Sequence, residues 1–502
     1  MNNFYSAFTY LGQPVPCALM ALGTTLGVVV GAIPGLTGTM LIALTIPFTF
    51  AMSGNDALIL LVSMYVGSVS GGLISATLLR MPGTPASIMT TLDGYPLAQK
   101  GKPGRALGLG ISASLFGGLV SWGFLVLLSK PLADASILLG PFDFFSLVLM
   151  ALVLIAIVSG KSLLRGMLSG FLGMLATMPG PIPATGERRW TLGFRDLDDG
   201  LRLLPVLIGL FAVNQIISNV VFPKDKPQVA SRTVGSLLLR WQDWKRHLWN
   251  LLRSSFIGTW VGILPGIGAN VASVLAYGTA RSRSKEPDKF GQGSEEGIIA
   301  SEAANNATVG GALIPLISLG IPGSVIDAVL IGALMIHGLQ PGPLLFQDRP
   351  DVVWTIMTTY LVANVFMFGL MTVTSRWMAR LMDVPKESLA PILLVCCIFG
   401  SYALSNRAFD VWVMLFFGLV GFGMERLKLP LAPFVIGFVL APIAEKNLAS
   451  GLMQSGGSYW PIVTRPVSLI FCLVSLGPVL WPILRYVHKQ ALAGRKHVFK
   501  TS

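Results

Sequence analysis

Long apolar runs are the sequence feature that most constrains the fold of this chain. Five examples, each long enough for a helix to cross a bilayer, are 106–129, 142–159, 201–221, 353–375 and 463–487. Of the 502 residues, 53% are hydrophobic and only 12% are charged. Soluble domains carry about 25% charged residues. The runs therefore predict an all-α polytopic membrane protein, with about 11–14 transmembrane or re-entrant helices in a lipid bilayer.

The net charge of +13 does not require a nucleic-acid partner. Basic residues cluster in short loops and in the C-terminal tail, as the positive-inside rule describes for membrane proteins. Residues 1–14 carry no charged side chain, so we expect no cleaved signal peptide. The cysteines lack metal-site spacing. The sequence contains neither an HExxH motif nor an apparent pair of membrane aspartates. We therefore expect no enzyme, no catalytic residues and no organic cofactor.

Four Pro-Gly pairs within apolar stretches recur in a fixed order and indicate an internal duplication. Pro34-Gly35 aligns with Pro265-Gly266 at an offset of 231 residues. Pro82-Gly83 aligns with Pro322-Gly323 at an offset of 240, with seven of the 18 surrounding positions identical. Aliphatic residues match easily by chance, so the ordered Pro-Gly pairs carry this inference.

The charges of equivalent loops predict that the two copies have opposite orientations. The loop 53–56 has no basic residue, whereas its counterpart 281–289 has four. The next loop, 93–105, has three basic residues, whereas its counterpart 338–347 has no Lys or Arg. Because basic loops stay cytoplasmic, equivalent loops face opposite sides of the membrane. This is an inverted-topology repeat, which many secondary transporters use.

We divide the chain accordingly into two repeats, a linker and a C-terminal part. The ranges are 1–222 for the first membrane repeat, 223–247 for a basic cytoplasmic linker, 248–450 for the second membrane repeat, and 451–502 for a final transmembrane helix with a basic cytoplasmic tail.

The segment 248–280 leaves the cytoplasmic side and returns to it in arms of about 16 residues, roughly 24 Å each. It is therefore expected to form a re-entrant hairpin with Pro265-Gly266 near its tip. By symmetry, 15–52 forms a hairpin around Pro34-Gly35. A helix over about 56–79 is expected to precede a break at Pro82-Gly83 and a short helix.

Broken helices at membrane depth are tolerated where protein or a cavity satisfies their backbone polar groups. Two inverted pairs of breaks would direct helix ends at a shared midplane site. Small polar side chains surround the breaks. We expect substrate contacts from Pro34, Gly35, Thr37, Thr39, Arg80, Pro82, Gly83, Thr84, Pro265, Gly266, Gly268, Asn270, Pro322, Gly323 and Ser324. Packing kinks at helix contacts are the alternative.

Ionisable residues inside apolar runs are costly and therefore informative. Glu302, Asn305 and Asn306 lie on adjoining helix faces and suit a coupling ion, either sodium or a proton. The alternative is an interhelical hydrogen-bond cluster. Arg80 either clamps a substrate carboxylate or extends to the membrane interface. Asp327 lies just after Pro322-Gly323.

Several phrases closely resemble the large membrane subunit of the tripartite tricarboxylate transporters, the TctA family. They include GAIPGLTGTMLIALTIPFTF, MPGTPASIMTTLDGYPLAQKGKPGRALG, LPGIGANVASVLAYG and EAANNATVGGALIPLISLGIPGS, within 20–120 and 250–350. The resemblance implies a bacterial inner-membrane carrier that works with a small membrane subunit and a periplasmic substrate-binding protein. It also implies uptake driven by a sodium or proton gradient. We find no GxxxxGK[ST] phosphate loop.

Two residues depart from the family pattern. Arg80 stands where the family usually has Asn, which bears on the accepted anion, and Ser301 stands where Pro is common. We expect the chain to import a tri- or dicarboxylate or a similar small organic anion. A non-transporting scaffold subunit and a passive anion channel are the alternatives. The sequence leaves open which anion is carried and whether the chain forms a homodimer.

Overall fold

The computed structural model describes residues 2–158, 162–222, 237, 239–381, 386–403 and 406–477. Within these residues the chain is almost wholly helical, and the strands are the two-residue β1 (Gly180–Pro181) and β2 (Arg188–Arg189), which pair in an antiparallel manner. The same residues contain seven helices long and apolar enough to cross a membrane, together with shorter apolar helices. The prediction of an all-α polytopic membrane protein is confirmed.

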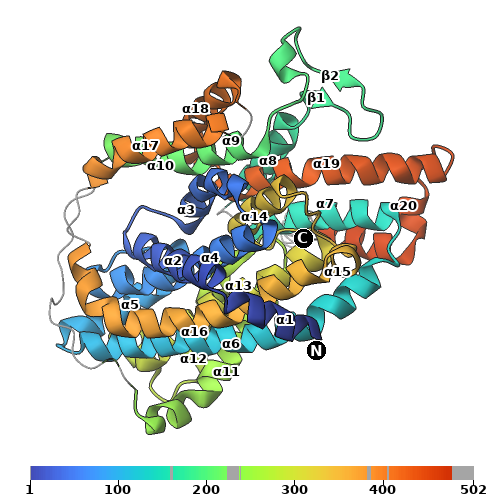
Figure 1. Cartoon of the computed structure of the whole chain (residues 1–502). Coiled ribbons are helices and arrows are strands. Elements are labelled where there is room, and N and C mark those ends of the chain that lie inside the picture. Colours follow the sequence, from blue (N-terminus) through green and yellow to red (C-terminus); the bar gives the residue numbers. More distant parts are fainter. Residues whose placement is uncertain are drawn as a thin grey trace, which may run out of the picture. The chain divides into compact units, whose positions relative to one another are not determined.

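The chain forms two compact units, of which the smaller comprises 138–200 and 432–502. Its described helices are α7 (Pro141–Val158), α8 (Leu163–Ala176), the 3-10 helix η3 (Arg195–Leu197), most of α19 (Leu431–Gln454), α20 (Pro461–Thr464) and the apolar helix Pro466–Gly477, which lies within the predicted final transmembrane helix (Figure 1). Arg465 pairs with Asp143 at 2.7 Å, and Arg189 Nη2 donates to Glu445 Oε2 at 2.7 Å. This unit holds none of the predicted site residues.

The larger unit comprises 1–137 and 201–431 and contains both sets of breaks. Its first set of helices is α1 (Asn2–Leu11), α2 (Pro14–Ala32), α3 (Gly38–Thr45), η1 (Ile46–Ala51), α4 (Gly54–Leu79), η2 (Pro85–Ser87), α5 (Ile88–Gln99) and α6 (Pro103–Ser136). Ser53 caps α4 by accepting a hydrogen bond from the Asp56 N–H at 3.1 Å. The predicted helix, break and short helix around Pro82-Gly83 are confirmed.

The second set repeats the order of the main helices from α2 to α6. It consists of α11 (Trp241–Ile263), α12 (Gly268–Arg283), η5 (Pro287–Lys289), α13 (Glu295–Leu319), α14 (Val325–Ile336), α15 (Leu345–Asp348) and α16 (Pro350–Leu381). Ser294 caps α13, as Ser53 caps α4. The other described helical segments of the unit are α9 (Leu203–Leu207), the π-helical η4 (Ile208–Val213), α10 (Asn214–Val221), α17 (Lys386–Ala403) and α18 (Ala408–Arg426).

Equivalent helices pack in equivalent ways. α2 packs against α4, and α11 packs against α13. Gly31 lies so close to the Ser68 carbonyl that a side chain would overlap it, and Gly262 lies in the same way against Thr308. These residues are related by the offsets of 231 and 240. The duplication therefore extends to individual backbone contacts.

The two central helices, α4 and α13, run in opposite directions. Tyr65, in the N-terminal half of α4, lies 3.0 Å from Ser324, which follows the C-terminal end of α13. Thr90, which follows the C-terminal end of α4, donates a hydrogen bond to Glu302 in the N-terminal half of α13. Because equivalent helices are antiparallel, the two repeats have inverted topology, as predicted.

In an inverted repeat, the two basic loops should lie on one side of the protein and the two loops without Lys or Arg on the other. Lys100 Nζ donates to the Gln292 carbonyl at 2.7 Å, which joins the basic loop of the first repeat to the segment that follows the basic loop of the second. Gly54 lies against Leu339, which brings together the two loops without Lys or Arg. The structure thus agrees with the orientation inferred from the positive-inside rule.

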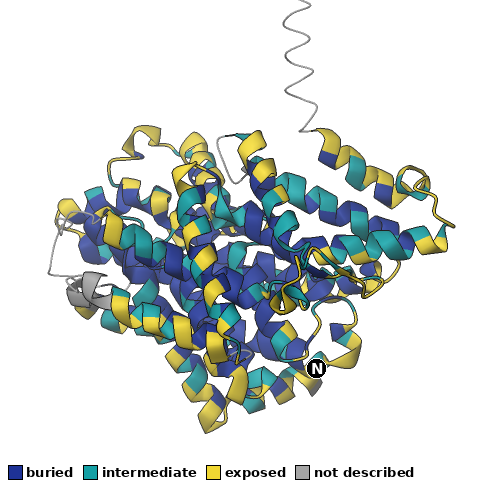
Figure 2. Cartoon of the chain, turned by 90° about the horizontal axis from the view of Figure 1, so that it is seen from above, coloured by how far each residue is buried: buried dark blue, intermediate teal, exposed yellow. Residues whose placement is uncertain are grey.

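The central helices are buried on every side. All residues from Ala57 to Leu79 of α4 and from Gly297 to Ser318 of α13 are buried. Buried residues are dark blue in Figure 2. A helix buried all round belongs to a core, so the polar side chains of these two helices face other helices.

Two predicted segments fall largely or wholly outside the described residues. Within the predicted linker 223–247, the structure describes residue 237 and residues 239–247, and α11 begins there at Trp241. The basic tail after residue 477 lies outside the described residues.

Candidate substrate and ion site

Both hairpins turn at their predicted Pro-Gly pairs. Residues 33–37 join α2 to α3, and residues 264–267 join α11 to α12. Gly35 has a φ of 93°, and both Gly266 and Gly268 have a φ of 71°. Positive φ angles are readily adopted by glycine because it has no Cβ. The glycines therefore allow the chain to reverse within a few residues.

Each hairpin contacts the second break of its own repeat. The Gly266 N–H donates to the Gly323 carbonyl at 2.8 Å. In both repeats the glycine of the second break lies close to a backbone carbonyl near the end of the first hairpin arm. Gly83 lies against the Gly31 carbonyl, and Gly323 lies against the Gly262 carbonyl. The four breaks thus form two pairs, one in each repeat.

Contacts between the repeats connect the two pairs of breaks. The second arm of the first hairpin, α3, packs against α14, and the second arm of the other hairpin, α12, packs against η2 and α5. Each hairpin therefore contacts the short helical segment that follows the break of the opposite repeat. A displacement of one hairpin would alter the surroundings of both breaks.

Hydroxyl side chains at the breaks cap the helices that follow. Thr37 accepts from the Met40 N–H at 3.1 Å, and Ser324 accepts from the Asp327 N–H at 3.4 Å. The burial of the predicted substrate residues varies. Pro34, Thr39, Gly83, Pro265, Pro322 and Gly323 are buried, Gly35, Thr37, Pro82, Thr84, Gly266, Gly268 and Ser324 are partly buried, and Arg80 and Asn270 are exposed.

Arg80 ends α4 in the left-handed conformation, with a φ of 54°. Its guanidinium carbon lies 5.9 Å from the centre of the Tyr95 ring. Gly320 holds the equivalent position at the end of α13, with a φ of 70°. Its side chain is exposed, and its backbone adopts a conformation that glycine tolerates better.

The three predicted ion residues are buried where α13 meets helices of the first repeat. Glu302 accepts hydrogen bonds from Thr90 and, at 3.5 Å, from Ser114. Asn306 accepts from Ser70 at 2.6 Å and donates to Ser114 at 2.8 Å. These bonds join α13 to α4, α5 and α6. Glu302 and Asn306 therefore belong to an interhelical hydrogen-bond cluster, the alternative that the sequence left open.

Asn305 differs from its neighbours because one of its polar atoms has no partner. Its Nδ2 donates to the Val69 carbonyl at 3.4 Å, whereas its buried Oδ1 has no hydrogen-bond partner. Leaving a buried acceptor unpaired costs free energy. An amide oxygen is also a ligand that hard cations accept. Asn305 Oδ1 is thus the atom of this cluster with spare capacity for a sodium ion.

The described residues contain no group of three or more His, Cys, Asp and Glu side chains that could hold a metal ion. A cation near Asn305 would therefore depend on amide, hydroxyl and carbonyl oxygens, together with the single carboxylate of Glu302. Such a donor set is compatible with a hard monovalent cation.

Sequence reasoning missed Asp93, a buried carboxylate in the middle of α5. Its Oδ1 accepts from the N–H groups of Gly291, Gly293 and Ser294 at 2.8, 2.9 and 2.7 Å. Its Oδ2 accepts from the Tyr277 hydroxyl at 2.8 Å. A lone carboxylate at the end of an apolar segment was the available sequence signal. The partners lie about 200 residues away in the sequence, so the pattern could not reveal them.

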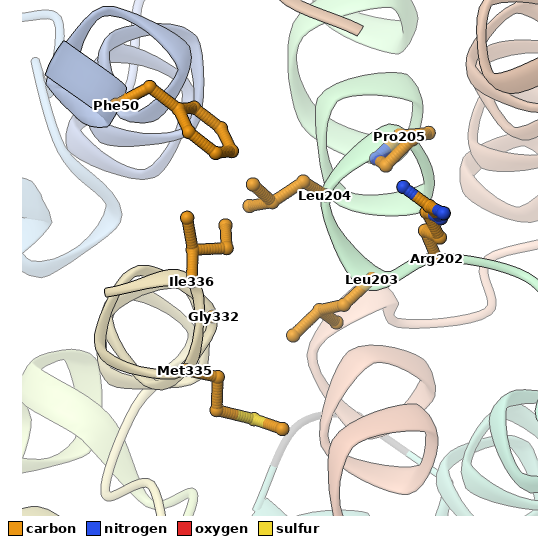
Figure 3. A pocket seen from close by; sticks show the side chains of 8 residues that line it. All are labelled: Phe50, Arg202, Leu203, Leu204, Pro205, Gly332, Met335 and Ile336. Atoms are coloured by element: carbon orange, nitrogen blue, oxygen red, sulfur yellow. The ribbon is translucent and has the colours of Figure 1, made fainter. Parts of the chain in front are cut away.

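A separate cavity of about 250 Å³ lies between η1, α9 and α14. Apolar side chains point into this space, and Arg202 lies at its edge (Figure 3). The lining residues are Phe50, Arg202, Leu203, Leu204, Pro205, Gly332, Met335 and Ile336. None of these is a predicted site residue, and the apolar lining is unsuited to a small polyanion.

The paired breaks and antiparallel central helices define a multi-pass membrane protein built as an inverted repeat, an architecture used by secondary transporters. The family model described as "Tripartite tricarboxylate transporter TctA family" matches residues 17–436. The chain belongs to this transporter family, which confirms the resemblance seen in the sequence. The family's systems consist of a large membrane subunit, a small membrane subunit and a periplasmic binding protein.

Two relatives from Agrobacterium vitis are similar to this chain. An uncharacterized 52.8 kDa protein in the TAR-I ttuC' 3' region is 31% identical over 491 residues, covering 98% of this chain and 97% of the relative. An uncharacterized protein in the TAR-II ttuC' 3' region is 32% identical over 223 residues, covering 44% of this chain and 91% of the relative. No solved structure matches the chain.

Proposed function

We propose that this chain translocates a tri- or dicarboxylate, or a similar small organic anion, across the bacterial inner membrane. A periplasmic binding protein delivers the anion, a small membrane subunit completes the complex, and a sodium or proton gradient drives uptake. The C-terminus lies in the cytoplasm. The observation that carries this proposal is the contact of each hairpin with the second break of the same repeat, inside an inverted repeat.

The helix ends at the breaks suit an anionic substrate. The first turns of α3, α12 and α14 begin at the breaks, and free N–H groups at helix N-termini favour negative charge. Backbone N–H groups, together with the hydroxyls of Thr37, Thr84 and Ser324, contact the carboxylate groups in this proposal. The glycines allow the ligand to approach the backbone closely.

A coupling ion binds at Asn305 in the same proposal. Its Oδ1 is the buried acceptor without a hydrogen-bond partner. Glu302 supplies nearby negative charge, and Asn306 fixes the position of α13 through its bonds to Ser70 and Ser114. The ion and substrate would thus bind at neighbouring parts of one helix framework.

The test uses proteoliposomes containing the chain and its small membrane subunit, with the binding protein outside. Labelled citrate, succinate and malate are offered in turn, with a sodium gradient, a proton gradient or neither. Accumulation above the equilibrium level with one gradient supports a secondary transporter. Equilibration without accumulation indicates a passive channel, and no flux with any anion contradicts the proposal in favour of a scaffold.

The ion role has its own variant. Asn305→Ala should abolish sodium-driven uptake while leaving expression unchanged, because it removes the free amide oxygen. Asn364→Ala is a matched control, since Asn364 is also a buried helix amide and bonds within its own helix to the Tyr360 carbonyl at 2.7 Å. Unchanged sodium-driven uptake by Asn305→Ala, or equal loss in both variants, would contradict the ion role.

A further inference from the structure

A second buried polar side chain without a partner lies at the other break. Asp327 is in the first turn of α14 and is fully buried. Neither of its carboxylate oxygens has a hydrogen-bond partner. The hydroxyl and the N–H of Ser324 are donors close to the carboxyl group, but neither has the geometry of a hydrogen bond to it. An ionised carboxylate buried in this way is strongly unfavourable unless a proton or a cation neutralises it.

The helices packed against α14 supply no such cation. They are α3, α4, α9 and α13. In these helices, α3 and α9 have no acidic or basic residue, and the part of α13 after Glu302 has none. The titratable group that faces Asp327 is Tyr65 of α4. Its hydroxyl lies 3.0 Å from Ser324 Oγ, so Tyr65, Ser324 and Asp327 form one polar group at the break.

The equivalent position in the first repeat shows that helix capping does not require a carboxylate. That position is Ser87, at the offset of 240 residues. Its hydroxyl accepts from the Thr84 N–H at 3.3 Å and donates to the Thr84 carbonyl at 2.8 Å. A neutral serine therefore closes the break after α4. The cap at the start of α14 therefore does not require a carboxyl group at residue 327.

We propose that Asp327 is a proton-binding group of the transport cycle. In the arrangement described here the carboxyl group holds its proton. When the hairpin formed by α2 and α3 moves away from α14, water reaches Asp327, the O–H bond breaks, and the proton passes to water. The ionised carboxylate then repels an anion at the Pro322-Gly323 break. The inference rests on the proposed transport function and adds a site distinct from Asn305.

The contact between α3 and α14 connects this proton to hairpin movement. Ile326, beside Asp327, lies 3.4 Å from the position that a side chain at Gly38 would occupy. Gly38 is the first residue of α3. Separation of the two helices at this point would uncover the first turn of α14.

The experiment uses the full complex in proteoliposomes with two variants. Asp327→Asn is the neutral isostere, and Asp327→Ser reproduces the cap of the first repeat. Three activities are measured with whichever of labelled citrate, succinate and malate the wild type accumulates. They are accumulation driven by a proton gradient, accumulation driven by a sodium gradient, and exchange of labelled for unlabelled anion without a gradient.

Both variants should lose accumulation driven by the proton gradient, down to the level of empty vesicles, and should retain exchange. Asp327→Glu should restore part of the proton-driven accumulation. Wild-type proton-driven accumulation in both neutral variants would overturn the proposal, as would loss of exchange in both. Loss confined to sodium-driven accumulation would also overturn it, by identifying a cation ligand. Failure of the proposed function itself would appear separately, as absence of wild-type transport.

Discussion

The Tyr277 hydroxyl donates a hydrogen bond to Asp93 Oδ2 at 2.8 Å, and this bond joins α12 of the second repeat to α5 of the first. The other oxygen of Asp93 accepts from three backbone N–H groups of the segment that leads into α13. One buried carboxylate thus holds a connecting segment of one repeat against a short helix of the other. This contact lies beside the basic loops joined by Lys100 and Gln292.

Replacing Asp93 should destabilise the protein more than replacing its side-chain partner. Asp93→Asn replaces the charged acceptor of three backbone N–H groups with a neutral amide, which weakens these bonds and places an NH2 group beside one set of donors, a loss of about 1–3 kcal/mol. Tyr277→Phe removes one hydroxyl, which typically costs about 1 kcal/mol. Thermal unfolding in detergent would compare the two. An equal or smaller decrease in the melting temperature for Asp93→Asn would contradict the predicted role.

The glycines where the paired helices approach closely should not tolerate alanine. A Cβ at Gly31 or Gly262 would overlap a backbone carbonyl of the facing helix, so each Ala variant should lose about 1–3 kcal/mol. Gly278, in α12, has open space around its Cβ position. Gly278→Ala should instead stabilise the helix by about 0.5–1 kcal/mol. Similar melting temperatures for the three variants would show that the helix contacts are misplaced.

Arg80 offers a test that separates backbone strain from charge. Arg80→Gly should increase stability by about 1 kcal/mol, because α4 ends there in the left-handed conformation. Arg80→Asn removes the charge, and Asn tolerates the same left-handed backbone conformation. A change in the uptake profile of this variant would therefore be due to the loss of the guanidinium group. A changed affinity for carboxylates supports a substrate clamp, and an unchanged profile supports the interface alternative. Lower stability of Arg80→Gly would count against the described backbone.

The loop charges predict that two loops of the second repeat face opposite sides of the membrane. Lys285→Cys lies in the basic loop of the second repeat, and Gln340→Cys lies in a loop without Lys or Arg. A membrane-impermeant thiol reagent applied to intact spheroplasts should label Gln340→Cys alone. Both should be labelled after lysis, in a background without the native cysteines. Labelling of Lys285→Cys before lysis would reverse the proposed topology.

Much of the fold followed from local sequence patterns. The apolar runs predicted membrane helices because a span needs about 20 apolar residues. The breaks at Pro34-Gly35 and its counterparts followed from the backbone limits of proline and glycine. The loop charges predicted the inverted orientation, which the antiparallel α4 and α13 confirm. Each of these signals lies within a short stretch of chain, or in a comparison of two such stretches.

The tertiary structure decided which polar atoms are satisfied and which are free. Asn305 and Asn306 are adjacent and chemically identical, yet Asn306 is bonded to Ser70 and Ser114 while Asn305 Oδ1 has no partner. Asp327 and Ser87 hold equivalent positions. The Ser87 hydroxyl is bonded to Thr84, whereas neither carboxylate oxygen of Asp327 has a hydrogen-bond partner. The sequence determined which residues the breaks contain. Their partners come from helices up to 259 residues away, so burial and hydrogen bonding depend on how distant segments pack.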